Sequence, residues 1–509
     1  MTEALEKRFE EIYALCLKMG LDPFPISFEE VPREVIWDTA SYGLPTRMSH
    51  WSFGKSFLHQ KMNGEMGFGK IYELIINNNP SLALLDETND DVSNMLICGH
   101  CWAHSDFFKN NIMFAPTNRN MVNQAEANAK TIDSFKDKYG VDEVEDWMDI
   151  AFALDGHIDW HRGENRPKYP APEHVFKTVN PLPYADIFGE EDKPKVIEKI
   201  INTEFPPHKE KDILWFLINY AKMLPWQREV LSMIRSEQFY FYPQGQTKIS
   251  NEGWASFWHA EIMLNYENLS PSEHLDFANS HSKIVRPGGG GSLNPYYVGF
   301  RIYTDIKKRW DEYYEAGKKN EAFQKSEDID HFDEKGNIDM SKMTGYEKIF
   351  QVCREDDDIS FICNYLTREL CEDMELFTYG LAGHEDDQEE DDIIIKDREL
   401  ENVKRTMVQR LHNGGVPPIV ITKADETGLY LEHDLKDHLE DGSGKVVRYN
   451  ELDPHYAQKT LEYIYRVWKR PVILTTRDKE GAEIRYEFGK DGLTEDISGS
   501  GSASKKFQI

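Results

Sequence analysis

Apolar residues recur at helical spacing along the first 370 residues of the chain. At the start, Leu5, Phe9, Ile12 and Cys16 fall on one face of a helix, and Gly20 can end it. The same period predicts further helices at 69–76, 92–110, 120–138, 144–155, 211–223, 226–239, 252–266 and 295–316. Proline and glycine predict loops at 166–183 and 287–293. The pattern therefore predicts a mainly α N-terminal body.

The pattern changes after an acidic run at 384–392, HEDDQEEDD. Beyond it, short strands are predicted at 418–422 and 428–433. One amphipathic helix follows at 457–468 and stops before Pro471, and a pair of strands is predicted at 472–476 and 483–488. The last residues, SGSGSASKKFQI, are of low complexity. We predict a helical core domain (1–383), an acidic linker (384–397), a smaller α+β C-terminal domain (398–490) and a disordered tail (491–509).

Composition narrows the class of protein. With 40% hydrophobic and 12% aromatic residues, the 509-residue chain is expected to be globular. Its formal charge of −31 repels phosphate backbones, which argues against nucleic acid as the main partner. No apolar run approaches the roughly 18 residues of a membrane span, and no signal peptide is apparent. Its six cysteines are scattered, so we expect no disulfide framework. Together these features predict a cytoplasmic protein that does not insert into a membrane.

The stretch ICGHCWAHSDFF at 97–108 contains two kinds of candidate chemistry. On a helix, His100 and His104 project from one face and can bind a single cation, with Asp106 close behind. The CGHC tetrad alone would suggest thiol–disulfide exchange, which needs its first cysteine at a helix N-terminus. Here the predicted helix begins upstream, so Cys98 and Cys101 are better interpreted as small buried residues. A zincin-type peptidase would need Glu directly after the first histidine, where Cys101 stands.

A second polar segment, ALDGHIDWH, ends at His161. Asp155 and Asp159 are four residues apart, as are His157 and His161, so a helix would pair them. Gly156 weakens the prediction of a regular helix here. A polar helix end without a ligand is the alternative interpretation.

A third segment, NEGWASFWH, places Glu252 and His259 seven residues apart, on one stripe of a helix between Trp254 and Trp258. A buried carboxylate and imidazole need partners, which a metal ion or a mutual hydrogen-bond network can supply. Glu73, in an apolar segment predicted to be helical, is a similar buried carboxylate.

Several long strings resemble the SpoVR family, that is, stage V sporulation protein R and its YcgB-like relatives. They are GLPTRMSHWSFGK (43–55), KIYELIINNNP (70–80), HCWAHSDFFKNN (100–111), PQGQTKISNEGWASFWH (243–259), LNPYYVGF (293–300), DMELFTYG (373–380) and YAQKTLEYIYRVWKRPVIL (456–474). The resemblance covers nearly the whole chain, and strings this long and rich in tryptophan are highly specific.

The resemblance implies which polar positions belong to the family pattern: His100, His104, Asp106, Asp155, Asp159, His161, Glu252 and His259. Cys98 and Cys101 are outside that pattern, which further disfavours the redox interpretation. Family members usually have Glu at the position of Asp155, and a histidine near Asn128 is missing here. The family is linked to spore cortex (peptidoglycan) formation in spore formers. In other bacteria it is linked to stress or stationary-phase physiology, beside a PrkA-type serine kinase and a von Willebrand A-like protein.

Two functions follow as hypotheses. The first is a metal-dependent enzyme, a hydrolase of a cell-wall or peptide-like substrate, with a divalent metal such as zinc. Its predicted ligands are His100, His104 and either His161 or His259, with Asp155 and Asp159 as further candidates, while Glu252 or Asp106 is the general base or orients a ligand. The second is a non-enzymatic regulatory or scaffold protein that acts with the kinase, its polar clusters being structural networks.

Overall fold

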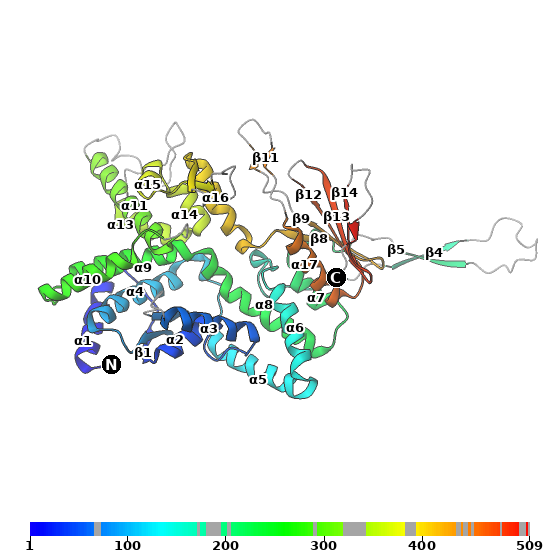
Figure 1. The fold of residues 1–509 in the computed structure, drawn as a ribbon, viewed down its shortest axis with the longest axis horizontal. Coiled ribbons are helices and arrows are strands. Elements are labelled where there is room, and N and C mark those ends of the chain that lie inside the picture. The colour runs from blue at the N-terminus through cyan, green and yellow to red at the C-terminus, as the bar shows by residue number, and fades with distance from the viewer. Residues whose placement is uncertain are drawn as a thin grey trace, which may run out of the picture. The chain divides into compact units, whose positions relative to one another are not determined.

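The architecture is that of a computed structural model of the chain. It describes residues 1–65, 73–170, 174–179, 195–200, 205–288, 293–318, 343–381, 393–433, 439–440, 446–448, 452–478, 481–497 and 505–506. The described chain divides into two compact units (Figure 1). Unit 1 comprises Met1–Ser134 and Tyr240–Gly415, and unit 2 comprises Phe135–Phe239 and Val416–Ile509.

Unit 1 is mainly helical. Its helices are α1 (Glu3–Lys18), α2 (Arg33–Tyr42), α3 (Trp51–Glu65), α4 (Asp91–Asn110), α9 (Lys248–Asn265), α10 (Pro271–Ile284), α11 (Pro295–Lys318), α13 (Gly345–Glu355), α14 (Asp358–Tyr365), α15 (Arg368–Asp373) and α16 (Leu400–Leu411), with short 3-10 turns η1 (Ile112–Phe114) and η4 (His412–Gly415). Two long helices, α5 (Met121–Tyr139) and α8 (Pro225–Gln246), begin in one unit and end in the other. A single large core joins α1, α4, α9, α11, α13 and α14.

Two small sheets accompany these helices. The first has the order β1-β3-β2, with β1 (Ile26–Val31) parallel and β2 (Glu73–Ile76) antiparallel to β3 (Ser81–Asp86). The second pairs β6 (Thr378–Leu381) with β7 (Ile393–Asp397) in antiparallel fashion. The helix predicted at 69–76 is therefore wrong from Glu73 onward. The short apolar run ELII fits a strand as well as a helix, and pairing with β3 decides the outcome.

Unit 2 contains a six-stranded mixed sheet of order β15-β14-β13-β12-β9-β8. Its strands are β8 (Ile419–Ala424), β9 (Leu429–His433), β12 (Val472–Arg477), β13 (Glu483–Gly489), β14 (Gly492–Ile497) and β15 (Lys505–Lys506). The strands β9 and β12 are parallel and are linked through α17 (Pro454–Trp468), whose buried face includes Ala457, Leu461 and Ile464. The other neighbouring strands are antiparallel.

Besides this sheet, α17 and its parts of α5 and α8, unit 2 contains α6 (Val141–Ala153), α7 (Ile213–Tyr220), the 3-10 turn η2 (Trp160–Arg162) and two strand pairs. The pairs are β4 (His174–Val179) with β5 (Lys195–Ile200), and β10 (Leu439–Glu440) with β11 (Val446–Arg448). The range 166–183, predicted to be a loop, therefore contains the strand β4.

The predicted fold class, a mainly α body with a smaller α+β part, is confirmed by these elements. The unit boundaries differ from the predicted domain boundaries, because each unit is built from two separate segments. The acidic run at 384–392 lies outside the described residues, while 393–397 forms β7. The range predicted to be a disordered tail begins with β14, which pairs with β13; residues 498–504 and 507–509 lie outside the described residues.

Candidate metal centre

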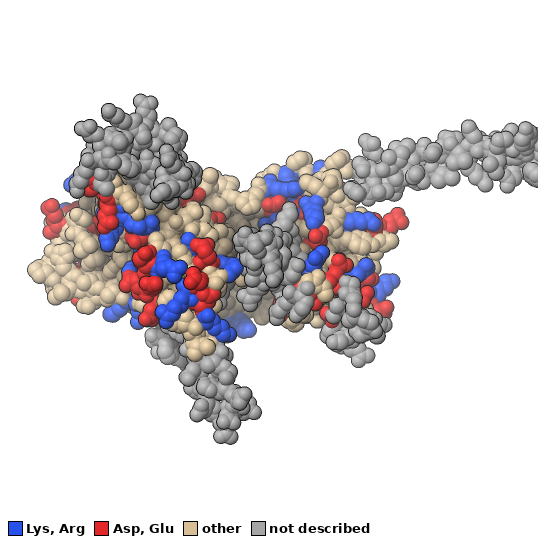
Figure 2. All heavy atoms as spheres, turned by 90° about the horizontal axis from the view of Figure 1, so that it is seen from above, with Lys and Arg blue, Asp and Glu red and all other residues tan. Residues whose placement is uncertain are grey.

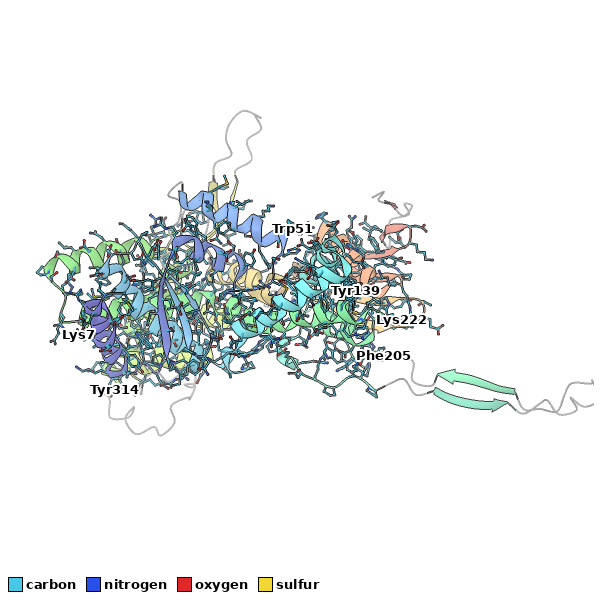
Figure 3. All side chains as sticks on the ribbon, turned by 90° about the horizontal axis from the view of Figure 1, so that it is seen from below. Lys7, Trp51, Tyr139, Phe205, Lys222 and Tyr314 are labelled. Atoms are coloured by element: carbon cyan, nitrogen blue, oxygen red, sulfur yellow. The ribbon has the colours of Figure 1, made fainter. Side chains whose placement is uncertain are left out.

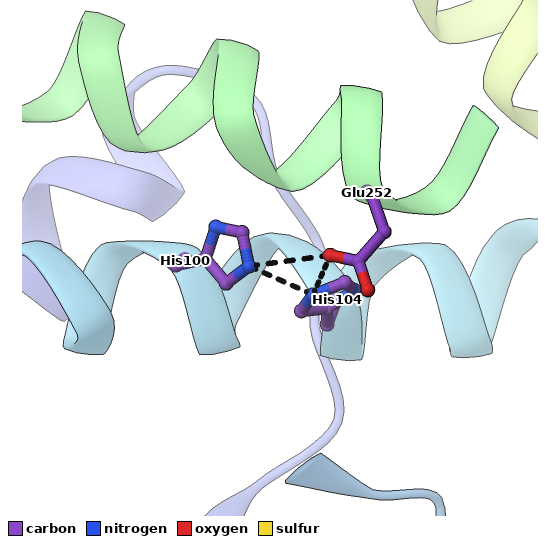
Figure 4. A group of neighbouring side chains, drawn as sticks. All are labelled: His100, His104 and Glu252. Carbon is purple, nitrogen blue, oxygen red and sulfur yellow. Dashed lines mark hydrogen bonds and ion pairs between the residues drawn. The ribbon is translucent and has the colours of Figure 1, made fainter. Parts of the chain in front are cut away.

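The helices α4 and α9 pack against each other in antiparallel orientation in the core of unit 1. A Cβ on Gly99 of α4 would lie 3.8 Å from the Cα of His259 and 3.4 Å from the Ile262 side chain, which are ordinary van der Waals distances, so the two helices are in direct contact here. The paired helices are drawn in Figure 4. The four-residue spacing of His100 and His104 directs both imidazoles toward α9, as predicted from the sequence.

Three side chains converge there: His100 and His104 from α4 and Glu252 from α9, here called the His-His-Glu cluster (Figure 4). The two Nε2 atoms of the histidines lie 3.0 Å apart. Glu252 Oε2 lies 3.2 Å from His104 Nε2 and 3.5 Å from His100 Nε2. The three residues are only 2%, 5% and 5% exposed, respectively. Three potential ligand atoms therefore form a small, nearly equilateral triangle in a buried site.

The remaining polar atoms of the cluster are held by neighbours. His104 Nδ1 lies 2.9 Å from Asn251 Oδ1, and Lys248 Nζ donates to Glu252 Oε1 at 2.5 Å. Glu252 Oε2 accepts no hydrogen bond of normal geometry from the residues that the structure describes. With His104 Nδ1 and Glu252 Oε1 engaged by these neighbours, His104 Nε2 and Glu252 Oε2 face the third atom of the triangle, His100 Nε2.

The electrostatics of the cluster keep Glu252 ionised. Burial by itself raises the pKa of Glu252, but the positive charge of Lys248 and the contacts with the two histidines outweigh it and hold that pKa well below its usual value. Burial lowers the pKa of His104, which favours the neutral imidazole that a metal requires. Glu252 in turn raises the pKa of Lys248. A carboxylate beside two imidazoles is a suitable donor set for a divalent cation.

Glu73 of β2 and Tyr296 of α11 border the cluster. Glu73 Oε1 lies 3.8 Å from His100 Nε2, and burial raises the pKa of this carboxyl group. The Tyr296 ring stacks on His100, with the ring centroids 6.0 Å apart and an interplanar angle of 17°. The charge of Glu252, followed by burial, raises the pKa of Tyr296 well above its usual value. A second carboxyl group and a phenol therefore lie beside the triangle.

His259, a predicted ligand, also comes to this site. Its Nδ1 lies 3.0 Å from His100 Nδ1, and its Nε2 lies 2.8 Å from Nδ1 of His281 in α10. His259 is fully buried, and burial lowers its pKa well below the usual value. It faces the side of His100 that is turned away from the His-His-Glu cluster.

Asp106 belongs to a different set of contacts. Its Oδ1 accepts hydrogen bonds from the Asp22 backbone N–H at 2.7 Å and from the Asn110 amide at 3.0 Å. Its Oδ2 accepts one from Trp254 Nε1 at 3.0 Å. Burial raises the pKa of Asp106 to about 6. The carboxylate ties α4 to the segment after α1 and to α9.

The other predicted ligands, Asp155, Asp159 and His161, lie in unit 2. Asp155 Oδ2 accepts a hydrogen bond from Gln238 at 2.6 Å, and Asp159 Oδ2 lies 3.4 Å from Arg162 Nε. The His161 ring contacts Trp160 edge to face. The structure brings these three residues into one loop and turn after α6, and their contacts named here are with residues of unit 2.

The cysteines of the CGHC tetrad are both buried and reduced. They lie within α4, which begins at Asp91, and burial raises both thiol pKa values well above normal. The interpretation of Cys98 and Cys101 as small buried residues is confirmed.

Sequence reasoning missed Lys248, Asn251, His281 and Tyr296. Lys248 stands four residues before Glu252, a spacing at which a helical ion pair is expected, so this partner had a usable signal. His281 and Tyr296 had none, because no pattern within α10 or α11 reveals which residue of another helix they meet.

Unit 1 is thus a helical body with a buried histidine–carboxylate cluster. The family model of the SpoVR-like protein matches residues 1–416, one residue beyond the end of unit 1, and the chain belongs to this family. A protein of Escherichia coli (strain K12) described as "Uncharacterized protein YcgB" is 29% identical over 401 residues, which is 74% of each chain. No solved structure matches.

Three surface features bear on partners. In the part of the chain that the structure describes, no helix is both long and apolar enough to cross a membrane. Acidic and basic side chains are interspersed on the face shown in Figure 2 rather than gathered in one basic patch. Trp51, which is 56% exposed, begins α3 (Figure 3).

Proposed function

We propose that unit 1 binds one divalent metal ion through His100 Nε2, His104 Nε2 and Glu252 Oε2. Zinc bonds to histidine and carboxylate are about 2.0–2.2 Å long, so tetrahedral ligands stand about 3.3 Å apart. The separations of 3.0, 3.2 and 3.5 Å fall around that value, and this fit is the main support for the proposal. Two imidazoles and one carboxylate favour zinc over magnesium or calcium.

The surroundings of the three atoms support the same assignment. In zinc proteins, a ligating histidine usually donates its other N–H to an oxygen, and a ligating carboxylate is itself hydrogen-bonded. Asn251 Oδ1 is placed to accept from His104 Nδ1, and Lys248 holds the Glu252 oxygen that faces away from the cluster. These contacts leave one electron pair of each ligand for the cation.

We further propose that the site is catalytic and hydrolase-like. Three protein ligands leave a fourth position open, as in catalytic zinc sites. A divalent ion in such a site polarises a substrate carbonyl or phosphoryl group and lowers the pKa of water. Glu73, whose Oε1 lies 3.8 Å from His100 Nε2, would be the carboxylate nearest to the ligands that could accept a proton from the attacking water. Lys248, whose side chain is 57% exposed, forms an ion pair with the buried Glu252, so the cluster lies near the protein surface on this side.

This assignment gives Glu252 the role of a ligand rather than a base. Asp106 remains a second candidate base, and Asp155, Asp159 and His161 remain candidate ligands. Family membership supports a cell-wall or peptide-like substrate, a role in spore cortex formation or stress physiology, and action beside a PrkA-type kinase and a von Willebrand A-like protein. The scattered cysteines support a cytoplasmic location.

A second candidate is a non-enzymatic regulatory or scaffold protein, in which the metal or a hydrogen-bond network stabilises the fold. The observation in its favour is the low exposure of His100 and His104, 2% and 5%, since a substrate must reach the ion. A sporulation or stress assay separates the two functions. If a folded variant lacking both histidines complements fully, the enzyme is excluded.

Elemental analysis tests the metal site directly. The protein should be purified without chelator and without a nickel column, and metal per chain compared between the native protein and His100→Ala/His104→Ala. We expect about one metal per chain, lost in the double variant. His274→Ala, an exposed histidine of the same unit, is the matched control and should keep its metal. His161→Ala shows whether unit 2 adds a ligand. Substoichiometric metal that the double variant does not change would refute the proposal.

A further inference from the structure

Three imidazoles from three helices form a continuous chain that ends at the His-His-Glu cluster. His281 in the last turn of α10 contacts His259 of α9, with 2.8 Å between Nδ1 and Nε2. His259 contacts His100 of α4, with 3.0 Å between the two Nδ1 atoms. His259 is fully buried, whereas His281 is partly exposed. The set His100, His259 and His281 is here called the imidazole chain.

The positions of the protons along the imidazole chain follow from simple rules. A contact between two neutral imidazoles needs one N–H and one lone pair. If a cation takes the lone pair on His100 Nε2, the proton of this ring is on Nδ1 and is donated to His259 Nδ1. The His259 proton is then on Nε2 and is donated to His281 Nδ1. Each ring has one proton, and every contact is satisfied.

Without a cation the direction of the chain is the opposite. Because Asn251 Oδ1 accepts from His104 Nδ1, His104 Nε2 presents a lone pair toward His100 Nε2, 3.0 Å away. The Glu252 Oε2 atom, a second acceptor, lies 3.5 Å from His100 Nε2, so His100 carries its proton on Nε2, facing both acceptors. His259 then donates from Nδ1 to His100, and His281 donates from Nδ1 to His259. Again each ring has one proton, and no ring changes its charge.

We infer that His259 and His281 are positioning residues for the metal ligand His100, an inference that rests on the proposed metal site. A cation on Nε2 makes the opposite N–H of the ring a stronger donor, and hydrogen bonds in a chain polarise one another. The chain is therefore stronger in the loaded state than in the empty one. His281 Nδ1 is the terminal acceptor that stabilises the loaded arrangement.

A matched pair of variants at His281 tests this role, since this residue is at a helix end and the variants are expected to fold. His281→Asn keeps an acceptor oxygen near the position of Nδ1, and His281→Leu has a similar shape without one. We expect His281→Leu to weaken the binding of Co²⁺ and Zn²⁺ to the metal-free protein about tenfold or more, as for other partners of metal ligands. His281→Asn should stay within about threefold of the native protein, and both metal-free variants should unfold at similar temperatures.

Nitrogen-15 NMR of histidine-labelled protein gives an independent readout, with the His281 signal assigned by its loss in His281→Asn. On zinc addition, the protonated nitrogen of His281 should change from Nδ1 to Nε2. An unchanged tautomer, or equal metal affinity of the Leu and Asn variants, would overturn the inference. If in that case His100→Ala still abolishes metal binding, the proposed metal site stands without a role for the imidazole chain. If the native protein itself binds no metal, both fall together.

Discussion

Gly253 of α9 faces Gly299 of α11 across a contact that has no room for a side chain. A Cβ on Gly253 would lie 2.4 Å from the Gly299 Cα, and a Cβ on Gly299 would lie 2.2 Å from the Ile249 carbonyl oxygen. Both obstacles are backbone atoms, which cannot rotate away. Since Glu252 precedes Gly253, this close contact between helices also fixes where the carboxylate enters the His-His-Glu cluster.

We expect Gly253→Ala to force α9 and α11 apart and to lower the free energy of unfolding by about 1–3 kcal/mol or more, as for other overpacked cores. Thermal unfolding of the metal-free protein measures this effect. Gly54→Ala in α3 is the control, because a Cβ there meets no atom within 4 Å and alanine favours a helix. Equal melting temperatures of the two variants would contradict the prediction.

Glu252 and Asp106, the two carboxylates proposed from the sequence as catalytic, should differ in metal binding and stability when each is replaced by its amide. Glu252→Gln should lose most of its bound metal, because an amide replaces the only anionic ligand of the cluster. Asp106→Asn should keep its metal but become less stable by about 1–3 kcal/mol, because one of the hydrogen bonds from Asp22, Asn110 and Trp254 loses its acceptor. Elemental analysis and denaturant unfolding of both variants check this. Metal loss from Asp106→Asn would place Asp106 in the centre after all.

The cysteines should react as structural residues. Five of the six are buried and Cys363 is exposed. Burial raises the thiol pKa values of Cys98 and Cys101 well above normal, so little thiolate is available at neutral pH. A thiol titration should therefore detect about one reactive group in the native protein and all six after denaturation. Rapid modification of Cys98 or Cys101, located by mass spectrometry, would revive the redox interpretation of the CGHC tetrad.

Acid should remove a link between α1 and α10. Glu273 accepts hydrogen bonds from the Ser270 backbone N–H at 2.8 Å and from Arg8 at 2.7 Å, and these lower its pKa to about 2. A carboxyl group with a lowered pKa in the folded state stabilises the fold above its unfolded pKa of about 4.3 and loses this effect as the pH falls toward 2. Glu273→Gln should thus cost about 1 kcal/mol at pH 6 and progressively less toward pH 3.

Denaturant unfolding at several pH values checks this difference. Glu10→Gln, a change at an exposed position of α1, is the control and should cost little at any pH. A cost for Glu273→Gln that stays constant between pH 6 and pH 3 would show that the carboxylate charge contributes nothing.

The sequence predicted what depends on position within one helix. The four-residue spacing of His100 and His104 and the seven-residue spacing of Glu252 and His259 each place two side chains on one face, and the two faces meet. Glu73 was assigned to the wrong type of element, since a short apolar run does not distinguish helix from strand without its pairing partner. The contact of His281 with His259 depends on packing between α9 and α10, which cannot be predicted from the periodicity within one helix.

The units could not be delimited from the sequence for a related reason. Composition changes near the acidic run suggested one break, whereas the chain leaves unit 1 after Ser134 and returns at Tyr240. α5 and α8 continue through these two points without interruption. A boundary inside a regular helix produces no proline, glycine or charge signal.

The discontinuity of unit 1 has a consequence for how the protein is made. His104 and Asn251, which contact each other at the candidate centre, are 147 residues apart in the chain. At typical rates of synthesis, the helix bearing the two histidines leaves the ribosome roughly ten seconds or more before its partner helix. During that interval, the face of α4 that packs against α9 in the folded protein lacks this partner, and a nascent chain that stops before Tyr240 lacks Glu252 and cannot form the His-His-Glu cluster.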